Sequence, residues 1–304
     1  MPKLSPLASV SATREVLQAH GLATKKALGQ HFLISDGVVA RICEVAQLAD
    51  SDIVLEVGPG IGTLSIALLK LSGQVIAIER DKDLPAVLAR TCADYADRFT
   101  LISKDALTLT QDDLPAPPNK FVANLPYAVA ATLVLDFFER FESLASATVM
   151  VQAEVADRMC AHPSTKTYGA YTVKLSLFAQ PVSRFSVAPG NFFPPPRVES
   201  SVLKLDRCYP TDARGIPLDA AQVRATCVMA DAAFTNRRKT LFNSCKTYFA
   251  QSNLPRAPRV LSHLGDLFSD ADIDSSRRGE TLSLVEFIEL GMRLDVLLSD
   301  KEGK

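Results

Sequence analysis

Residues 54–65 read VLEVGPGIGTLS, and this stretch decides the fold. The run from 53 to 57 is apolar except for Glu56, which favours a parallel strand covered on both faces. The glycines that follow allow a sharp turn and a close ligand approach, because no Cβ stands in the way. Apolar residues then recur at helical spacing over 64–71. The pattern predicts a helix whose N-terminus faces polar or anionic groups of a ligand.

A second apolar run, residues 75–78, ends in Glu79, twenty-one residues after Gly58. An acid at the tip of a neighbouring strand can accept hydrogen bonds from both hydroxyls of a ribose. The motif therefore predicts a nucleoside-cofactor site, and the alternative is a glycine turn that only joins a strand to a helix. The spacing G-x-G-x-G differs from the dinucleotide pattern G-x-G-x-x-G, which favours S-adenosylmethionine over NAD.

Strand and helix patterns alternate along the first two thirds of the chain, which predicts an α/β fold with a doubly wound parallel sheet. Its ligand crevice would lie at the carboxyl ends of the strands, where Gly58, Glu79, Asp105 and Asn124 are expected. The segment 168–180 fits a strand and a helix equally well. The expected strands are 53–57, 75–78, 99–103, 121–123, 148–152, 184–187 and 201–205, and the expected helices are 84–92 and 132–141.

We expect three regions along the chain. Residues 1–24 are rich in Ser and Ala and form an N-terminal extension with one short helix, capped by Ser11. Residues 25–209 form the α/β domain, in which Asp36 can cap the first helix. Residues 210–304 carry only helical patterns, which predicts a small all-α domain. Its expected helices are 220–234, 238–249 and 282–298.

Composition excludes several classes of protein. The 304 residues are 47% apolar and 22% charged, which is typical of a globular chain with a large core. No apolar run approaches the ~18 residues needed to cross a bilayer, and the N-terminus lacks an apolar signal core. We therefore expect a cytoplasmic protein with no membrane partner. The six cysteines form no C-x-x-C pair and the four histidines are dispersed, so we expect neither disulfides nor a metal centre.

The formal net charge of −1 hides a gradient along the chain. Residues 202–270 hold ten Lys and Arg against six Asp, a net of +4, which leaves −5 for the remainder. A polyanion partner would explain this imbalance, and so would a solvated helix face.

Residues 124–127 read NLPY at the expected mouth of a strand beside the cofactor site. Methylation of a base amine requires acceptors that hold its N–H groups and turn its lone pair toward the methyl donor. The Asn124 side-chain carbonyl and a backbone carbonyl held outward by Pro126 can supply them. The aromatic ring of Tyr127 can stack on a base that has been extruded from the RNA base stack. The alternative is a turn with a packed tyrosine.

Seven motifs occur together: 28–33 (LGQHFL), 56–62 (EVGPGIG), 105–106 (DA), 124–127 (NLPY), 168–169 (YG), 193–200 (FPPPRVES) and 234–240 (FTNRRKT). From Gly21 onward the chain resembles the KsgA family of small-subunit ribosomal RNA adenine N6,N6-dimethyltransferases. The resemblance implies a Rossmann-like S-adenosylmethionine-dependent methyltransferase domain and a helical C-terminal RNA-recognition domain. It also implies dimethylation of two adjacent adenines near the 3′ end of small-subunit (16S) rRNA, a step in ribosome biogenesis. The expected partner of this monomer is the small ribosomal subunit or its precursor.

The resemblance also assigns roles to individual residues, with Asp105 on the adenine amino group of the cofactor and Phe193 facing Tyr127 across the target base. Two departures stand out: His31 replaces the usual Asn, and Ala128-Val129 replace a polar residue and Ile. The implied cofactor contacts are His31, Leu33, Gly58, Gly60, Glu79, Asp105 and Asn124. The implied catalytic residues are Asn124, Leu125, Pro126, Tyr127 and Phe193.

Five basic residues are expected to contact RNA phosphates, although each could also belong to an ordinary solvated surface. They are Lys25, Lys26, Arg237, Arg238 and Lys239, the last three opening a helix.

Three other functions share some of these features. A dinucleotide-dependent oxidoreductase would share the crevice but would need a catalytic His or Tyr-Lys pair, which residues 124–127 do not provide. A non-catalytic RNA-binding assembly factor would not require an intact donor site. The antibiotic-resistance enzymes that methylate large-subunit rRNA have a similar catalytic domain, but the long helical C-terminal region favours the small-subunit enzyme.

Overall fold

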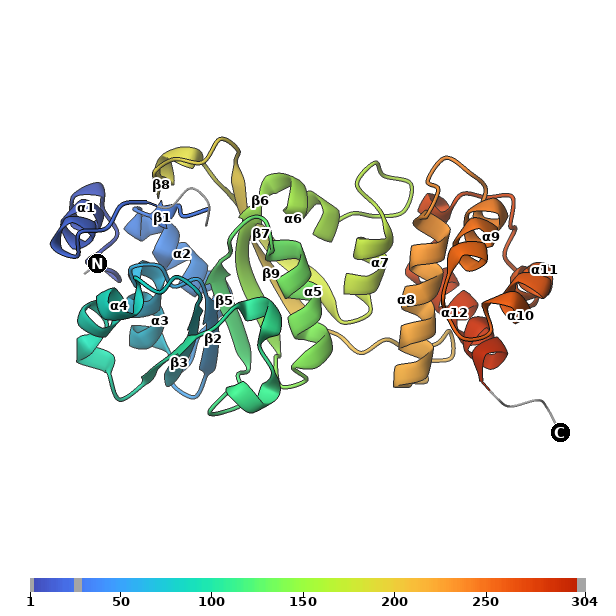
Figure 1. The fold of residues 1–304 in the computed structure, drawn as a ribbon, viewed down its shortest axis with the longest axis horizontal. Helices are drawn as coiled ribbons and strands as arrows, with labels where there is room; N and C mark the ends of the chain where they lie inside the picture. The colour runs from blue at the N-terminus through green and yellow to red at the C-terminus, as the bar shows by residue number, and fades with distance from the viewer. Residues whose placement is uncertain (1–2, 25–28, 300–304) are drawn as a thin grey trace. The chain divides into compact units, whose positions relative to one another are not determined.

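The computed structural model describes residues 3–24 and 29–299 (Figure 1). Contacts divide the chain into two compact units, of which the first comprises Met1–Ala156 and Pro181–Arg207. The second comprises Asp157–Gln180 and Cys208–Lys304. The chain passes from the first unit to the second between Arg207 and Cys208, close to the expected domain boundary at residue 210. Residues 157–180, expected within the sheet domain, group instead with the helices, because Tyr168 and Val173 pack in the helical core.

The first unit is built on a seven-stranded sheet in the order β4-β3-β2-β5-β6-β9-β7. Strands β2 to β6 all run parallel to one another, whereas β9 runs antiparallel to β6. The predicted α/β fold with a doubly wound sheet is confirmed. The strands are β2 (Ile53–Val57), β3 (Gln74–Glu79), β4 (Phe99–Ser103), β5 (Lys120–Asn124), β6 (Ser146–Gln152), β7 (Ala179–Val187) and β9 (Ser200–Arg207).

The strand order reverses at β2, since the chain runs outward from β2 to β4 and then returns to β5 on the other side of β2. Right-handed crossovers then put the helix after β5 on the face opposite the helix after β2. A ligand crevice is expected at this reversal, outside the carboxyl ends of β2 and β5. The helices of this part of the chain are α1 (Val10–Ala19), α2 (Asp36–Ala46), α3 (Thr63–Leu71), α4 (Pro85–Thr91), α5 (Ala130–Arg140) and α6 (Ala153–Met159), and 3-10 turns span Ala93–Tyr95, Ala106–Thr108, Gln111–Asp113 and Pro189–Asn191.

Two predicted N-cap residues are wrong, although each lies within two residues of the observed N-cap. Ser9 rather than Ser11 caps α1, where its hydroxyl accepts from the backbone N–H of Ala12. Ser35 caps α2, and the Asp36 carboxylate accepts instead from the backbone of Leu4 and Ser5. Asp36 therefore ties the N-terminal segment to the first unit, and several side chains of this segment join the core of the unit.

A short antiparallel ladder lies beside the main sheet. It pairs β1 (Phe32–Leu33) with β8 (Phe192–Phe193), in the register Phe32↔Phe193 and Leu33↔Phe192. The ladder thereby brings the LGQHFL and FPPPRVES motifs together, although they are about 160 residues apart in the sequence.

The second unit is helical around a core that includes Phe249, Phe268 and Phe287, all buried. Close approach of α8 and α12 depends on Gly291, because a Cβ there would lie 2.1 Å from the Thr226 hydroxyl. The ambiguous segment 168–180 forms a helix and then enters β7. The helices are α7 (Ala170–Ser176), α8 (Ala220–Phe234), α9 (Leu241–Gln251), α10 (Ala257–Ser262), α11 (Leu264–Asp270) and α12 (Leu284–Leu298), with a 3-10 turn at Gly279–Thr281.

Candidate active site

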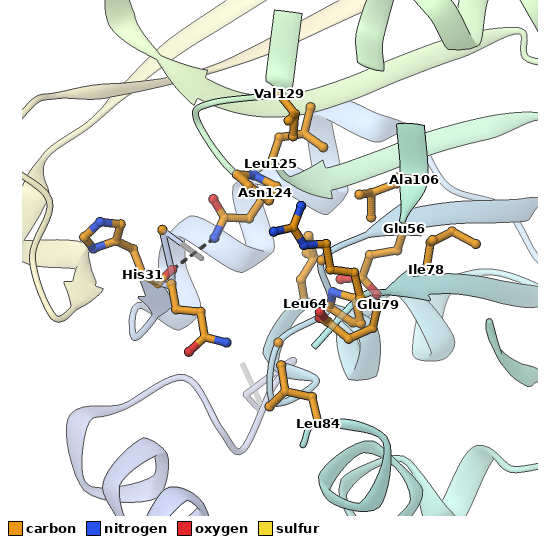
Figure 2. A pocket seen from close by; sticks show the side chains of 18 of the residues that line it. His31, Glu56, Leu64, Ile78, Glu79, Leu84, Ala106, Asn124, Leu125 and Val129 are labelled. Atoms are coloured by element: carbon orange, nitrogen blue, oxygen red, sulfur yellow. Dashed lines mark hydrogen bonds between the residues drawn. The ribbon is translucent and has the colours of Figure 1, made fainter. Parts of the chain in front are cut away.

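A cavity of about 390 Å³ lies in the first unit at the carboxyl ends of the parallel strands (Figure 2). The glycine turn, the tips of β3 and β5 and the segment before β1 all contribute to its wall. The sequence-predicted residues that line it are His31, Leu33, Gly58, Gly60, Glu79, Asp105, Asn124, Leu125, Pro126 and Tyr127.

The glycine turn forms one wall of the cavity. Gly58 and Gly60 have φ of +71° and +61°, in the left-handed region that side chains disfavour. A Cβ on Gly60 would also stand 3.1 Å from the ring of Phe32. The backbone can therefore pass close to β1 only because residue 60 has no side chain.

Glu79 ends β3 and is 8% exposed, with its side chain on the cavity wall (Figure 2). Its Oε1 accepts from the backbone N–H of Asp81 at 2.8 Å. Burial raises the pKa of this carboxyl above its ordinary value, although backbone donors at Asp81 and Gly60 oppose the shift. An acid so placed can accept hydrogen bonds from hydroxyl groups inside the cavity.

Glu56 also lines the cavity, although the sequence motifs did not assign it to the site. Its side chain is 1% exposed, and among the described residues nothing donates to its Oε2. Burial, assisted by the negative charge of Glu79, raises the pKa of Glu56 to about 8. The hydroxyl of Thr63, another lining residue, is buried and without a partner in the same part of the chain. The single acid in an otherwise apolar strand was the signal that could have identified Glu56.

Asp105 lies just beyond β4 and also lines the cavity. One carboxylate oxygen accepts from the backbone N–H of Leu107 at 3.0 Å, and the other lies 3.3 Å from the guanidinium of Arg80. Both side chains of this ion pair are about half exposed, so the pair adds little stability. Arg80 is a second cavity residue that sequence reasoning missed.

Asn124 ends β5, and its side chain lies between His31 and Leu125 (Figure 2). Its Nδ2 donates to the backbone carbonyl of His31 at 3.2 Å. This bond directs the amide so that Oδ1, which accepts no hydrogen bond from the described residues, remains available. The backbone of Leu125 is fixed by a 3.1 Å bond from its N–H to the carbonyl of Met150.

Tyr127 is half-buried, and its hydroxyl lies 2.7 Å from that of the buried Ser200. Burial raises the pKa of the Tyr127 phenol. The ring of His31 stacks on that of Tyr127, with centroids 5.9 Å apart and planes 25° apart. Phe193, expected to face Tyr127, is not among the described residues that line the cavity. The guanidinium of Arg14 lies 5.1 Å from the centroid of its ring instead.

The basic residues expected to contact RNA differ in their environments. Lys25 and Lys26 lie outside the described residues. Arg237 is engaged within the second unit, since its guanidinium donates to the carbonyls of Tyr168 and Thr165 and pairs with Glu280 at 2.8 Å. The remaining two, Arg238 and Lys239, are exposed, and their side chains make no hydrogen bond or ion pair with the described residues. The prediction that the three open a helix is wrong, because Thr240 caps α9 after an intervening turn.

Over residues 3–24 and 29–299, no group of three or more His, Cys, Asp or Glu side chains could hold a metal ion. Within the same ranges, no helix has the length and apolar character that crossing a membrane requires.

Residues 21–289 match the family model described as ribosomal RNA adenine dimethylase. The chain is 38% identical to ribosomal RNA small subunit methyltransferase A of Acidothermus cellulolyticus, over 91% of each chain. It is 40% identical to the protein of the same name in Mycobacterium avium, over 92% of this chain and 86% of that one. A solved dimethyladenosine transferase from Plasmodium falciparum is similar in fold, with a TM-score of 0.70 and 24% identity over 86% of this chain and 96% of that one.

Proposed function

Because the chain belongs to the ribosomal RNA adenine dimethylase family, we propose that it dimethylates the N6 amino groups of two adjacent adenines near the 3′ end of small-subunit rRNA. The methyl donor is S-adenosylmethionine. The names of the curated relatives support the small subunit over the large one as the substrate. The proposed partner is the small ribosomal subunit or its precursor, which the enzyme meets as a monomer in the cytoplasm.

The observation that carries this proposal is the position of Asn124 at the cavity edge, with Nδ2 bonded to His31 and Oδ1 left as an acceptor. The lone pair of an adenine N6 is delocalised into the ring. The amine becomes nucleophilic only when acceptors bind its N–H groups and turn the lone pair toward the methyl donor. An acceptor fixed by a second hydrogen bond does this without reorganising during the reaction.

The residues of the cavity fit a sulfonium nucleoside. The unpartnered Oε2 of Glu56 and the unpartnered hydroxyl of Thr63 are polar atoms that lack hydrogen-bond partners within the protein, and a bound polar ligand could satisfy them. Glu79 would hold the ribose hydroxyls, Asp105 would hold an amino group of the purine, and the glycine turn leaves the amino-acid end room beside the backbone. When bound, the donor supplies an electrophilic methyl group on sulfur.

The protein itself holds the amine and the base. Oδ1 of Asn124, with a backbone carbonyl of the NLPY segment, accepts from the two N–H groups of the target amine. The ring of Tyr127, fixed by its bond to Ser200, stacks on the base. No strong general base is required, because a methylated amine loses its proton readily to water.

For RNA binding we retain Arg238 and Lys239 as phosphate contacts, because both are exposed and unpaired among the described residues. Arg237 has a structural role as well, since it joins three segments of the second unit. Lys25 and Lys26 stay predictions from the sequence. Such contacts position the RNA, whereas choice of the adenine depends on RNA shape and on the extruded base.

Transfer of tritium from labelled donor to small-subunit particles from cells lacking the protein, with the labelled bases mapped, tests the proposal. We expect two adjacent dimethylated adenines. Asn124→Ala should lower the single-turnover rate about 10²- to 10³-fold, as for removal of one fixed polar group from a transition state, while RNA affinity changes little. Asn253→Ala, an exposed change in the second unit, is the matched control. Label on large-subunit rRNA, or near-normal turnover of Asn124→Ala, would contradict the proposal.

A further inference from the structure

His31 makes three contacts that no other described residue of the cavity combines. Its backbone carbonyl accepts from Asn124, its ring stacks on Tyr127, and its Nδ1 lies 2.7 Å from the backbone carbonyl of Pro194. Figure 2 shows the imidazole turned away from Glu79, on the far side of the bond to Asn124. The side chain therefore faces the 193–200 segment rather than the wall that Glu79 and the glycine turn form.

The chemistry of the Pro194 contact fixes the tautomer of His31. A carbonyl oxygen can only accept, so Nδ1 must carry the proton and donate it. The β1–β8 ladder ends at the pair Phe32↔Phe193, which leaves the carbonyls of residues 31 and 194 outside it. Each of these carbonyls instead accepts from a side chain, and both bonds involve residue 31.

Building on the proposed function, we propose that His31 is a positioning residue for the target base, through Asn124 and Tyr127, and that it matters most for the second methyl transfer. The imidazole fixes the plane of the Tyr127 ring, while its bond to Pro194 holds residue 31 where its carbonyl orients the Asn124 amide. An asparagine at this position could replace the donor to Pro194 but could not stack on Tyr127.

The two transfers place different demands on these groups. An unmodified adenine amine has two N–H groups, so two acceptors define its orientation. After one methylation a single N–H remains, and the angle of the amine then depends more on how firmly the base is stacked. In the second transfer N6 forms its new bond to carbon as the carbon–sulfur bond breaks, the electron pair stays on sulfur, and the last N–H proton leaves to solvent. Loss of the His31 ring should therefore lower the second rate more than the first.

The test compares His31→Asn, His31→Phe and wild type on small-subunit particles with saturating donor, in single-turnover reactions. Digestion and mass spectrometry measure monomethyl- and dimethyladenosine over time. For His31→Asn we expect the ratio of second to first transfer rates to fall about two- to tenfold, because the variant loses the aromatic pair that fixes the Tyr127 ring. His31→Phe keeps a ring and loses the Nδ1 donor, so both rates should fall together, about two- to tenfold.

Two controls separate this role from others. Donor affinity, measured by calorimetry, should change less than twofold in both variants, because the ring faces away from Glu79. His263→Asn alters an exposed histidine of the second unit and should change neither rate.

Other results would overturn the inference in distinguishable ways. A faster first transfer in His31→Asn would mean that the imidazole blocks the place of the base. An unchanged rate ratio would mean that the His31 side chain only packs against its neighbours. Weakened donor binding would mean that this side chain contacts the cofactor instead of the target base. Wild-type protein that binds donor but leaves the adenines unmethylated would overturn the proposed function and this inference with it.

Discussion

Glu56 is a buried carboxylic acid inside strand β2, and the free energy of unfolding should depend on its titration in a defined direction. Its pKa is about 8 in the folded protein and near 4.5 in the unfolded chain. Between these values the folded state binds the extra proton, so the free energy of unfolding falls as pH rises. The contribution is fully present below pH 4.5 and is lost above about pH 8. The whole interval corresponds to at most roughly 5 kcal/mol, at about 1.4 kcal/mol per pH unit.

The perturbation is Glu56→Gln, which keeps the shape of the neutral acid and removes the titration. Below pH 4.5 Glu56 is protonated in both the folded and the unfolded state, so titration does not separate the two proteins there. At pH 6, 1.5 pH units higher, the wild type should already have lost about 2 kcal/mol relative to the variant. Between pH 6 and 8.5 the wild type should lose roughly 2–3 kcal/mol relative to the variant, since about two pH units of the interval lie in this range.

Urea denaturation followed by circular dichroism at both pH values provides the assay, and the difference between the two proteins cancels the titration of all other groups. Glu139→Gln, on the exposed side of α5, is the matched control and should track the wild type. A Glu56→Gln difference that stays constant between pH 6 and 8.5 would refute the reasoning, because it would mean that Glu56 is already ionised in the folded protein.

Three further predictions concern donor binding, RNA binding and the stability of the second unit. Glu79→Ala should weaken S-adenosylmethionine binding about ten- to a hundredfold, because hydrogen bonds to a charged group worth about 1.5–3 kcal/mol are lost. An unchanged affinity, measured by calorimetry, would mean that Glu79 does not bind the ribose hydroxyls. Replacing Arg238 and Lys239 together by Ala should lower affinity for small-subunit particles and reduce its salt dependence by roughly 0.7–0.9 of a log-log slope unit per lost contact, with donor binding intact. Arg237→Ala should also lower the urea midpoint of the second unit, because its bonds to two carbonyls and to Glu280 are lost; an unchanged midpoint would argue against its structural role.

Features with a local cause could be predicted from the sequence. The turn at 58–62 requires glycine for its backbone conformation. Strand-type and helix-type apolar spacings alternate along the chain, and this pattern predicts a parallel sheet without knowledge of the tertiary packing. Because parallel strands end at one edge, Gly58, Glu79, Asp105 and Asn124 were expected at a common crevice, and all four line one cavity. Family membership followed from the combination of motifs rather than from any single one.

Features that depend on which groups meet across long sequence distances needed the tertiary structure. Arg237 and Arg238 are adjacent and chemically identical, yet only the packing of residues 165, 168 and 280 against Arg237 decides which side chain is engaged. Glu56 is a neutral acid because desolvation depends on everything that packs around it. The contacts of His31 arise because the β1–β8 ladder aligns it with Pro194, 163 residues away. A local pattern specifies the backbone of its own segment, but pairing, burial and charge are properties of neighbours that the chain brings together only on folding.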